Sequence, residues 1–479
     1  MKKNLLSIAV AASVAGTSAQ AAMYLNPEGT GQVLLFPYYN AENNNETSIH
    51  IVNTTTDAKA VKVRILEYVN SQEVLDFNVY MSAEDHFSFT IYTDPNGTGG
   101  ALITRDNTCT VPALGDATAG VPGSTEVVNG KTVRIQPFLP YAYAEDIYDS
   151  IYRTKIGHVE VIEMGTLEGA WAVDATHGAD GVPADCPQLV TNWSTGGIWT
   201  TDPGNNIGAP TGGIYGVSNL LNNQDAASWG IEASAIADFW DVQTAPAATR
   251  HTNPGERLPS LASGDNSSLV PDAGAYYALT YTSNVDAVSS LFMTTSVSND
   301  VMVNPNISGM TDWVITFPTR RYYVDNPVAI APFTDEYLGA VAPNSSCEEI
   351  SVEQWDREEA FIPPVIGGPI FSPRPPAQPD DPAASICYET NTIAAGSATS
   401  AMNVTMSTST TAAAGVSLAF SYTEGWQRIT FADAAHEMDA ATGPTLQGLP
   451  AIGFAAFKYN NGTSNYGFAS DHKTAIATS

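Results

Sequence analysis

Residues 61–66 read VKVRIL, residues 75–80 read LDFNVY and residues 87–91 read FSFTI. In each segment apolar residues alternate with mostly polar ones, which is the pattern of a β-strand with one buried face. The polar segments 53–57 and 70–72 separate the strands as turns do. This part of the chain is therefore predicted to form consecutive antiparallel strands of a β-sandwich.

The stretch from Ile49 to Ile91 resembles, in a general way, the immunoglobulin-like strands of many exported proteins, in which an Asn/Thr turn joins alternating strands. Helical patterns are sparse, and one short helix is expected near residues 284–297. The predicted fold class is therefore mainly β: an antiparallel, immunoglobulin-like β-sandwich with long Gly/Pro-rich excursions and at most one or two short helices. Resemblance at the level of the fold gives no information on function. Further strands are expected at 132–136, 157–164, 231–240, 275–282, 312–317, 417–422, 427–431 and 452–459.

The chain has 479 residues, 43% of them hydrophobic, which is enough to bury a large core. Residues 96–130 and 363–382 are rich in Gly, Pro, Thr or Asn and are expected to be irregular. The predicted organisation has five parts. These are a signal peptide at 1–21, a β-sandwich region at 22–165, a second mostly β region with one short helix at 166–330, a Pro-rich, disulfide-clamped excursion at 331–395, and C-terminal strands at 396–479 that complete a sandwich.

The N-terminus has the features of a secretory signal peptide. Lys2 and Lys3 precede an apolar run at residues 5–15, and the small-x-small pattern of residues 19–21 follows. Cleavage is expected after Ala21. No later apolar run is long enough for a transmembrane helix. The protein is therefore predicted to be exported to the cell surface or extracellular space, with the periplasm as the alternative.

An exported chain with an even number of cysteines is expected to form disulfides. The four cysteines allow three connectivities, and we favour Cys109 with Cys186 and Cys347 with Cys387, because each pair brackets a loop-rich stretch within one region. A zinc site would favour close pairs such as C-x-x-C, whereas every cysteine here stands alone.

The formal net charge is −31, from 50 Asp and Glu against 19 Lys and Arg, although only 14% of residues are charged. The acidity thus arises mainly from a shortage of basic residues. Proteins that bind nucleic acid neutralise phosphates with clustered Lys and Arg, and no such cluster occurs in this chain. Nucleic acid is therefore excluded as a partner, and other copies of the chain or other surface components are the expected partners.

The sequence contains no G-x-S-x-G or S-x-x-K motif. This absence argues against an enzyme, but it does not exclude one, because a catalytic triad needs no local motif. No catalytic residue is nominated. One cluster of ionisable residues could serve in an acid/base or metal site, although a polar turn beside a disulfide explains it equally well. Its members are Asp174, His177, Asp180 and Asp185.

Metal ligands are not identified either. His158 and Glu160 share one face of a predicted strand, where they could bind zinc, but a polar exposed face is the more common outcome. No cofactor is expected, and calcium is kept as an alternative because excess carboxylates attract divalent ions.

Tryptophans supply the candidate ligand-binding residues. Trp193, Trp199, Trp229 and Trp240 lie between Gly-rich turns and could stack on sugar rings, whereas burial in the core is the more common fate of tryptophan. Three functions follow in order of preference. The first is an exported, non-enzymatic structural or adhesive protein of the cell surface or extracellular space. The second is a secreted or periplasmic carbohydrate-binding module, and the third is a secreted hydrolase with a dispersed site.

Overall fold

The computed structural model describes residues 22–117, 122–272, 275–339, 346–362, 385–396, 399–407, 414–431 and 434–478. Strands make up 45% of the chain and helices 11%. The mainly β, antiparallel fold is therefore confirmed, and the immunoglobulin-like variety of sandwich stays a prediction. The predicted signal peptide and the segment 363–382 lie outside the described residues.

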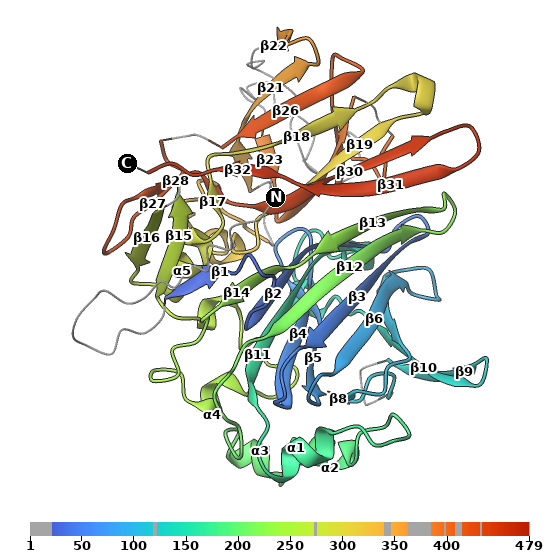
Figure 1. The fold of residues 1–479 in the computed structure, drawn as a ribbon, viewed down its shortest axis with the longest axis vertical. Helices are drawn as coiled ribbons and strands as arrows, with labels where there is room; N and C mark the ends of the chain where they lie inside the picture. The colour runs from blue at the N-terminus through green and yellow to red at the C-terminus, as the bar shows by residue number, and fades with distance from the viewer. Residues whose placement is uncertain are drawn as a thin grey trace, which may run out of the picture.

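The N-terminal unit is built from two facing sheets, drawn mainly in blue and green in Figure 1. The first has nine strands, antiparallel except for the β1–β15 pair. Their order is β16 (Ala275–Thr280), β15 (Ser267–Asp272), β1 (Met23–Leu25), β14 (Ser234–Ala237), β2 (Val33–Asn40), β11 (Ile156–Thr166), β4 (Lys59–Glu67), β5 (Glu73–Met81) and β8 (Cys109–Val111). The second has seven strands, in the order β13 (Ala227–Glu232), β12 (Ile214–Asn222), β3 (Asn45–Asn53), β6 (His86–Thr93), β7 (Gly100–Thr104), β10 (Lys131–Pro137) and β9 (Ser124–Val128).

The alternating residues that predicted these strands form the core between the two sheets. Val61, Val63 and Ile65 of β4 lie in one hydrophobic cluster with residues of β3, β5, β6 and β11. Burial of such side chains stabilises the sandwich by roughly 1.5–3 kcal/mol each. β7, β8 and β9 fall in the stretch 96–130, so the prediction that this stretch is irregular was wrong.

The opposite face of the nine-stranded sheet is also buried, although the alternation predicted a solvated face. All nine residues of β4 are buried. Lys62 Nζ lies 2.7 Å from a carboxylate oxygen of Asp76 and donates to the carbonyl of Glu256, in a loop that covers this face. Arg64 pairs with Glu160 of β11 and with Glu73 of β5. The charged side chains are therefore covered and paired with one another.

The C-terminal unit, drawn mainly in yellow to red, contains two five-stranded sheets (Figure 1). One has the order β22 (Phe361–Ile362), β21 (Ser351–Asp356), β26 (Glu424–Thr430), β18 (Ser296–Met302) and β32 (Lys473–Ala475). The other has the order β25 (Gly415–Leu418), β24 (Thr390–Ala395), β19 (Met310–Thr316), β30 (Ile452–Asn460) and β31 (Asn465–Asp471). Three two-stranded ribbons complete it: β17 (Met293–Thr294) with β29 (Leu449–Pro450), β20 (Cys347–Glu349) with β23 (Ser385–Cys387), and β27 (Glu437–Met438) with β28 (Leu446–Gln447).

The described residues contain six short α-helices, more than the one or two expected. The predicted helix is α5 (Asn284–Ser290), which is shorter than expected, and Val297 belongs to strand β18. The other helices have four to seven residues, too few for a visible hydrophobic period, and most lie in Gly-rich segments. They are α1 (Ala170–Ala175), α2 (Cys186–Asn192), α3 (Ile198–Thr201), α4 (Ala247–Arg250) and α6 (Arg321–Val324). The described residues also contain four 3₁₀ helices: η1 (Tyr141–Tyr143), η2 (Ile151–Lys155), η3 (Leu261–Ser263) and η4 (Pro305–Ile307). No described helix is long and apolar enough to cross a membrane.

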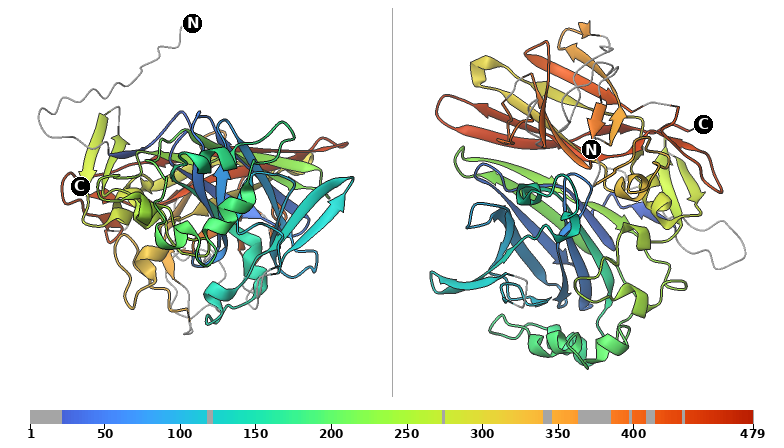
Figure 2. Two further views of the ribbon diagram at one scale, coloured as in Figure 1. Left: turned by 90° about the horizontal axis from the view of Figure 1, so that it is seen from below. Right: turned by 180° about the vertical axis from the view of Figure 1, so that it is seen from behind.

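The two units pack directly against each other, as the right-hand view of Figure 2 shows. Trp229 of β13 is fully buried there, and its indole N–H donates to the carbonyl of Phe457 at 2.9 Å. Lys458 pairs with Asp225 at 2.6 Å. A shared apolar cluster also includes residues of β2, β12, β19 and β30. The units therefore form one continuous body.

A buried ionic network crosses this boundary. Arg153 of η2 donates from Nε and Nη2 to the two carboxylate oxygens of Glu67, at the end of β4. The same carboxylate accepts the backbone N–H groups of Val69, Asn70 and Gln72. These bonds shape the turn after β4, where the carbonyl of residue 68 accepts two backbone N–H groups from the C-terminal unit. A charged pair thus positions a backbone contact between the units.

Two buried glutamates near this boundary have opposite electrostatic environments. Burial opposes ionisation of Glu348, but a hydrogen bond with His436, the charge of Arg320 and hydrogen bonds from Thr334 outweigh it and lower its pKa. Burial raises the pKa of Glu389 well above its usual range, and Arg320 offsets this only in part. Among the described residues, neither carboxylate oxygen of Glu389 has a hydrogen-bond partner.

Glu389→Gln is expected to stabilise the protein as the pH rises. Because the pKa of Glu389 is raised in the folded state, its contribution to stability is present below about pH 4.3, the unfolded value, and is lost as the pH rises through the folded value. The variant should melt about 1 °C higher than wild type at pH 8 for each 1 kcal/mol of stability gained, because the shift in melting temperature becomes smaller as the chain becomes longer. Calorimetric scans between pH 5 and pH 8 measure this, and the advantage should shrink towards pH 5.

Glu348→Gln is the matched control, with the opposite sign. The lowered pKa of Glu348 makes its charge stabilising above about pH 4.3, and this contribution is lost as the pH falls through the folded value. The variant should therefore melt at lower temperature than wild type at pH 7, because it weakens a buried charged contact. Equal shifts in the same direction for both variants would contradict the assignment.

Candidate functional site

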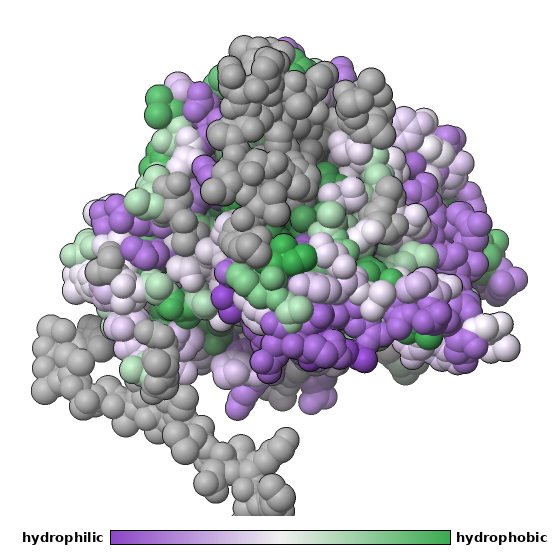
Figure 3. Space-filling view, turned by 90° about the horizontal axis from the view of Figure 1, so that it is seen from above, coloured by the Kyte–Doolittle hydropathy of each residue, from purple (hydrophilic) through white to green (hydrophobic). Residues whose placement is uncertain are grey.

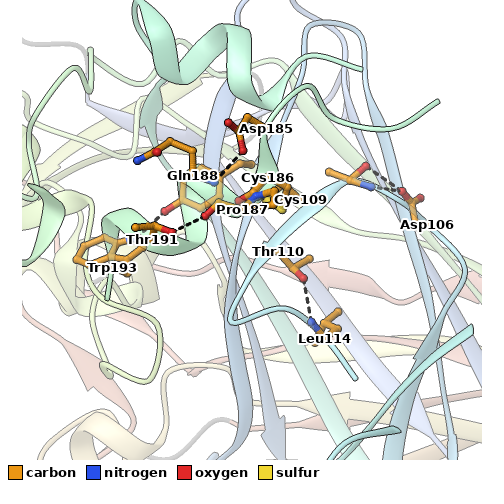
Figure 4. Close-up of a disulfide and its surroundings, with 12 residues drawn as sticks. Asp106, Cys109, Thr110, Leu114, Asp185, Cys186, Pro187, Gln188, Thr191 and Trp193 are labelled. Atoms are coloured by element: carbon orange, nitrogen blue, oxygen red, sulfur yellow. Dashed lines mark hydrogen bonds between the residues drawn. A yellow bond between two sulfur atoms is a disulfide. The ribbon is translucent and has the colours of Figure 1, made fainter. Parts of the chain in front are cut away.

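Three short helices form a cap over one end of the nine-stranded sheet of the N-terminal unit. It comprises α1, α2 and α3 and lies at the bottom of the molecule in Figure 1. The Cys109–Cys186 disulfide ties β8 to the first residue of α2, with a Cα–Cα distance of 5.4 Å (Figure 4). This bridge fixes the cap to the sheet.

Local sequence explains why α2 starts at the disulfide. The Asp185 carboxylate accepts the backbone N–H of Gln188 at 3.1 Å, as an N-cap does (Figure 4). Pro187 occupies the first turn, where no intrahelical donor is needed. The Thr191 hydroxyl donates to the carbonyl of Pro187. The cap is thus a short helix fixed at its N-terminus by a carboxylate and by a disulfide.

Beneath the cap lies a cluster of aromatic rings. The Tyr80 hydroxyl accepts the indole N–H of Trp193 at 2.7 Å and contacts Nε2 of His251 at 2.9 Å. Trp199 stacks on Tyr80 with ring centroids 5.3 Å apart. Burial lowers the pKa of His251 to about 4, so that this imidazole is neutral at physiological pH. The cluster joins the cap to the sheet and leaves these polar groups bonded to one another.

Three of the four tryptophans considered for sugar stacking are buried. Trp199 and Trp229 are fully buried, and Trp240, which donates to the carbonyl of Glu163 at 2.7 Å, is nearly so. Their rings contact protein, so stacking on a sugar would require them to leave the core. Trp193 is partly exposed, at the edge of the aromatic cluster.

Exposed aromatic rings occur instead on β31. Tyr466 is 42% and Phe468 is 48% exposed. Each stacks on its cross-strand neighbour in β30: Tyr466 on Tyr459, with centroids 5.2 Å apart, and Phe468 on Phe457, at 4.5 Å. The two-residue spacing of Tyr466 and Phe468 was a usable signal, since it places both rings on one face of a strand.

A hollow of about 140 Å³ lies beside the Cys109–Cys186 disulfide. Asp106 at its wall accepts the backbone N–H groups of Ser88 and Thr108, both at 3.0 Å. Arg134 donates to the backbone carbonyl of Asp106. The polar groups of the wall thus stabilise the loop, and no nucleophile and base are paired across the hollow within the described residues.

One serine, histidine and aspartate do converge nearby, although sequence reasoning did not associate them. Ser82 Oγ lies 3.0 Å from Nδ1 of His177, and Asp85 lies 3.7 Å from the same nitrogen. In a catalytic triad, serine and aspartate contact opposite nitrogens of the imidazole. Because both contact Nδ1 here, the arrangement cannot transfer a proton from Ser82 to a base oriented by Asp85.

Two aspartates of the predicted cluster of Asp174, His177, Asp180 and Asp185 stabilise local structure. The Asp180 carboxylate accepts the backbone N–H of Val182, and Asp185 caps α2. Burial and the neighbouring charge of Asp185 raise the pKa of Asp174. Among the described residues, no group of three or more His, Cys, Asp or Glu is placed to hold a metal ion.

His158 and Glu160, the zinc candidates on β11, are buried. Glu160 is paired with Arg64, whose guanidinium would repel a cation. Burial, with a smaller effect of Arg64, lowers the pKa of His158 to about 3, and neither ring nitrogen has a hydrogen-bond partner. These two residues belong to the covered face of the sheet.

The second disulfide joins Cys347 to Cys387, directly opposite each other in the β20–β23 ribbon. Both favoured cysteine pairs are therefore confirmed. No described cysteine is free. Two disulfides are typical of a protein that folds in an oxidising compartment.

The β9–β10 hairpin presents an open strand edge. It projects from the body (Figures 1 and 2), and all five residues of β9 are exposed. A two-residue turn at Asn129 and Gly130, both with positive φ, makes Val128 and Lys131 a hydrogen-bonded pair. The alternation of an antiparallel ladder then directs the N–H and C=O of Val127 away from β10. Val127 is 74% exposed.

Comparison with known proteins gives no functional information. No protein family matches the chain, and no curated protein or solved structure gives a significant match.

Removal of the Cys109–Cys186 bridge should loosen the helical cap. The double variant Cys109→Ser/Cys186→Ser is expected to lose about 4 kcal/mol of stability, because the bridge closes a long loop. Hydrogen exchange should increase in α1–α3 more than in β4 and β11. The Cys347→Ser/Cys387→Ser variant is the control, and unchanged exchange in α1–α3 is expected there. Protection of α1–α3 that survives loss of their own bridge would contradict this role.

Proposed function

We propose that this protein is an exported, non-enzymatic structural or adhesive protein of the cell surface or extracellular space, and that copies of it associate through open strand edges. The observation that carries the proposal is the exposed outer edge of β9. Folded proteins usually protect such edges with charges, prolines or covering loops, because an open edge pairs with other chains.

The two valines at the end of β9 favour pairing, whereas the charge of Glu126 in the same strand opposes it. The strand sequence STEVV ends in two β-branched apolar residues, and Val127 directs its free N–H and C=O away from β10. A strand from another copy could accept and donate these hydrogen bonds, as in β-strand addition. Exposed valine side chains would be buried in the same contact.

A second open edge lies on the other side of the molecule. β16 ends the nine-stranded sheet opposite β9 in Figures 1 and 2, and Tyr276 within it is 43% exposed. Within the described part of the chain, the outer edge of β16 is bonded to the residue 441–442 loop at Thr280. Two different edges on opposite sides suit head-to-tail contacts, which produce open chains of molecules when the rotation does not close a ring.

The surface charge fits life outside the cytoplasm. Among the described residues, eight lysines and arginines and seven acidic residues are buried, although the chain has 19 basic residues against 50 acidic ones. The exposed surface is therefore even more acidic than the composition. Figure 3 shows hydrophilic residues in large areas of the upper face, with apolar residues in smaller groups. Such a surface disfavours nonspecific aggregation, so contacts between copies would be limited to defined edges.

Val127→Lys is expected to weaken self-association. A lysine on an edge strand opposes pairing with another strand. The purified wild-type chain should form concentration-dependent assemblies, visible by light scattering and electron microscopy, and the variant should need about tenfold higher concentration, equivalent to 1.4 kcal/mol per contact.

Val328→Lys is the matched control. Val328 is 73% exposed, close to the value for Val127, but it lies in a loop. The control should assemble as wild type does, which separates the edge from a general effect of added charge. A wild-type chain that remains monomeric at all concentrations, or equal effects of the two substitutions, would reject the edge contact.

Carbohydrate binding is the second candidate, and the exposed β31 rings favour it. Aromatic side chains that stack on a neighbour with one face can offer the other face to a ligand. Tyr466 and Phe468 provide two such rings on one strand, unlike the buried Trp199 and Trp229.

For this candidate, Tyr466→Ala and Phe468→Ala should each weaken binding in a glycan array by roughly tenfold or more, because each removes one stacking face. Tyr276→Ala is the control, since that ring is similarly exposed on a different sheet. A glycan signal that is unchanged in both β31 variants, or no signal for the wild-type chain, would remove carbohydrate binding by these rings.

A further inference from the structure

Two histidines meet on the outer face of the seven-stranded sheet. His50 lies in β3 and His86 is the first residue of β6. The ladder places Val52 opposite His86 and His50 opposite Ser88, so the two histidines are diagonal neighbours on one face. Their rings are stacked, with centroids 5.3 Å apart and planes 29° apart.

The shortest contact joins Nδ1 of His50 to Nε2 of His86 at 3.1 Å. A hydrogen bond at this distance needs one N–H and one lone pair, so the two facing nitrogens hold a single proton between them. Two nitrogens bound to one tetrahedral zinc ion at about 2.0–2.1 Å would lie about 3.3 Å apart. The facing nitrogens are therefore already spaced nearly as a metal ion requires.

The surroundings leave both rings open to a metal ion. His50 is partly exposed and His86 is exposed, so an ion can reach both from solvent. A neutral imidazole is the form that binds metal. His50 lines a shallow hollow that also contains Glu46 and Arg105. The net charge of the chain is strongly negative, which favours cations over anions near the molecule as a whole.

We propose that His50 and His86 form a two-histidine binding site for a borderline transition-metal ion such as Zn²⁺. The ion takes the place of the proton shared by the facing nitrogens, and that proton moves to the other nitrogen of the same ring, so that both imidazoles stay neutral. Water or a donor from another molecule fills the remaining positions of the ion. Two protein ligands make an open site, which agrees with the lack of any three-residue metal cluster among the described residues. This proposal does not depend on self-association.

Isothermal titration of the full mature chain with Zn²⁺ alone tests the site. One ion per chain should bind at pH 7.5, and binding should weaken as the pH falls, because protons compete with the metal ion for its ligands. His50→Ala and His86→Ala should each abolish the binding, and both substitutions are on the surface, so circular dichroism should report an unchanged fold. Ca²⁺ should not compete, because it prefers oxygen ligands.

His177→Ala is the matched control, since His177 is a partly exposed histidine elsewhere on the same unit. This variant should bind Zn²⁺ as wild type does. With Cu²⁺ as a probe, electron paramagnetic resonance should show two coupled imidazole nitrogens in the wild-type chain. Absence of Zn²⁺ binding, binding that survives in His50→Ala or His86→Ala, or loss of binding in His177→Ala would overturn the proposal.

Discussion

The bidentate pair between Arg153 and Glu67 is the contact on which the arrangement of the two units depends. Glu67 uses the same carboxylate to hold the turn after β4, and that turn accepts backbone N–H groups from the C-terminal unit. Arg153 also donates to Asp146, which in turn accepts the hydroxyl of Tyr337. Because removal of one partner leaves an unpaired buried charge, at a cost of roughly 3–5 kcal/mol, this boundary is fixed by electrostatics as well as by apolar packing.

The local alternation of apolar and polar residues was sufficient to predict β4, β5 and β6, because a repeat of two residues is the pattern of a half-buried strand. It could not predict that the charged face of β4 is covered. Lys62 and Arg64 have the same pattern as solvated residues, and their partners Asp76 and Glu160 become visible only from strand pairing. The disulfide pairs were predictable because each bracketed one loop-rich region, and both are formed.

The candidate sites were harder to predict, since each depends on register. His50 and His86 are 36 residues apart, and only the β3–β6 ladder brings their rings together. The open edge of β9 lay in a stretch whose Gly and Pro content favoured an irregular loop. The burial of the tryptophans was equally hard to predict. Trp199 and Trp229 stand between Gly-rich turns in the sequence, but their burial depends on the complete fold and not on their sequence neighbours.

The burial of cations also determines how the folded chain reacts with reagents. Lys59, Lys62, Lys155 and Lys458 are buried, and among the described lysines only Lys131 and Lys473 are exposed. Amine-reactive cross-linkers would therefore modify the folded molecule at very few places. One of these, Lys131, lies on the β9–β10 hairpin. Because few amines are exposed, Lys131 is a selective site for chemical labelling beside the open strand edge.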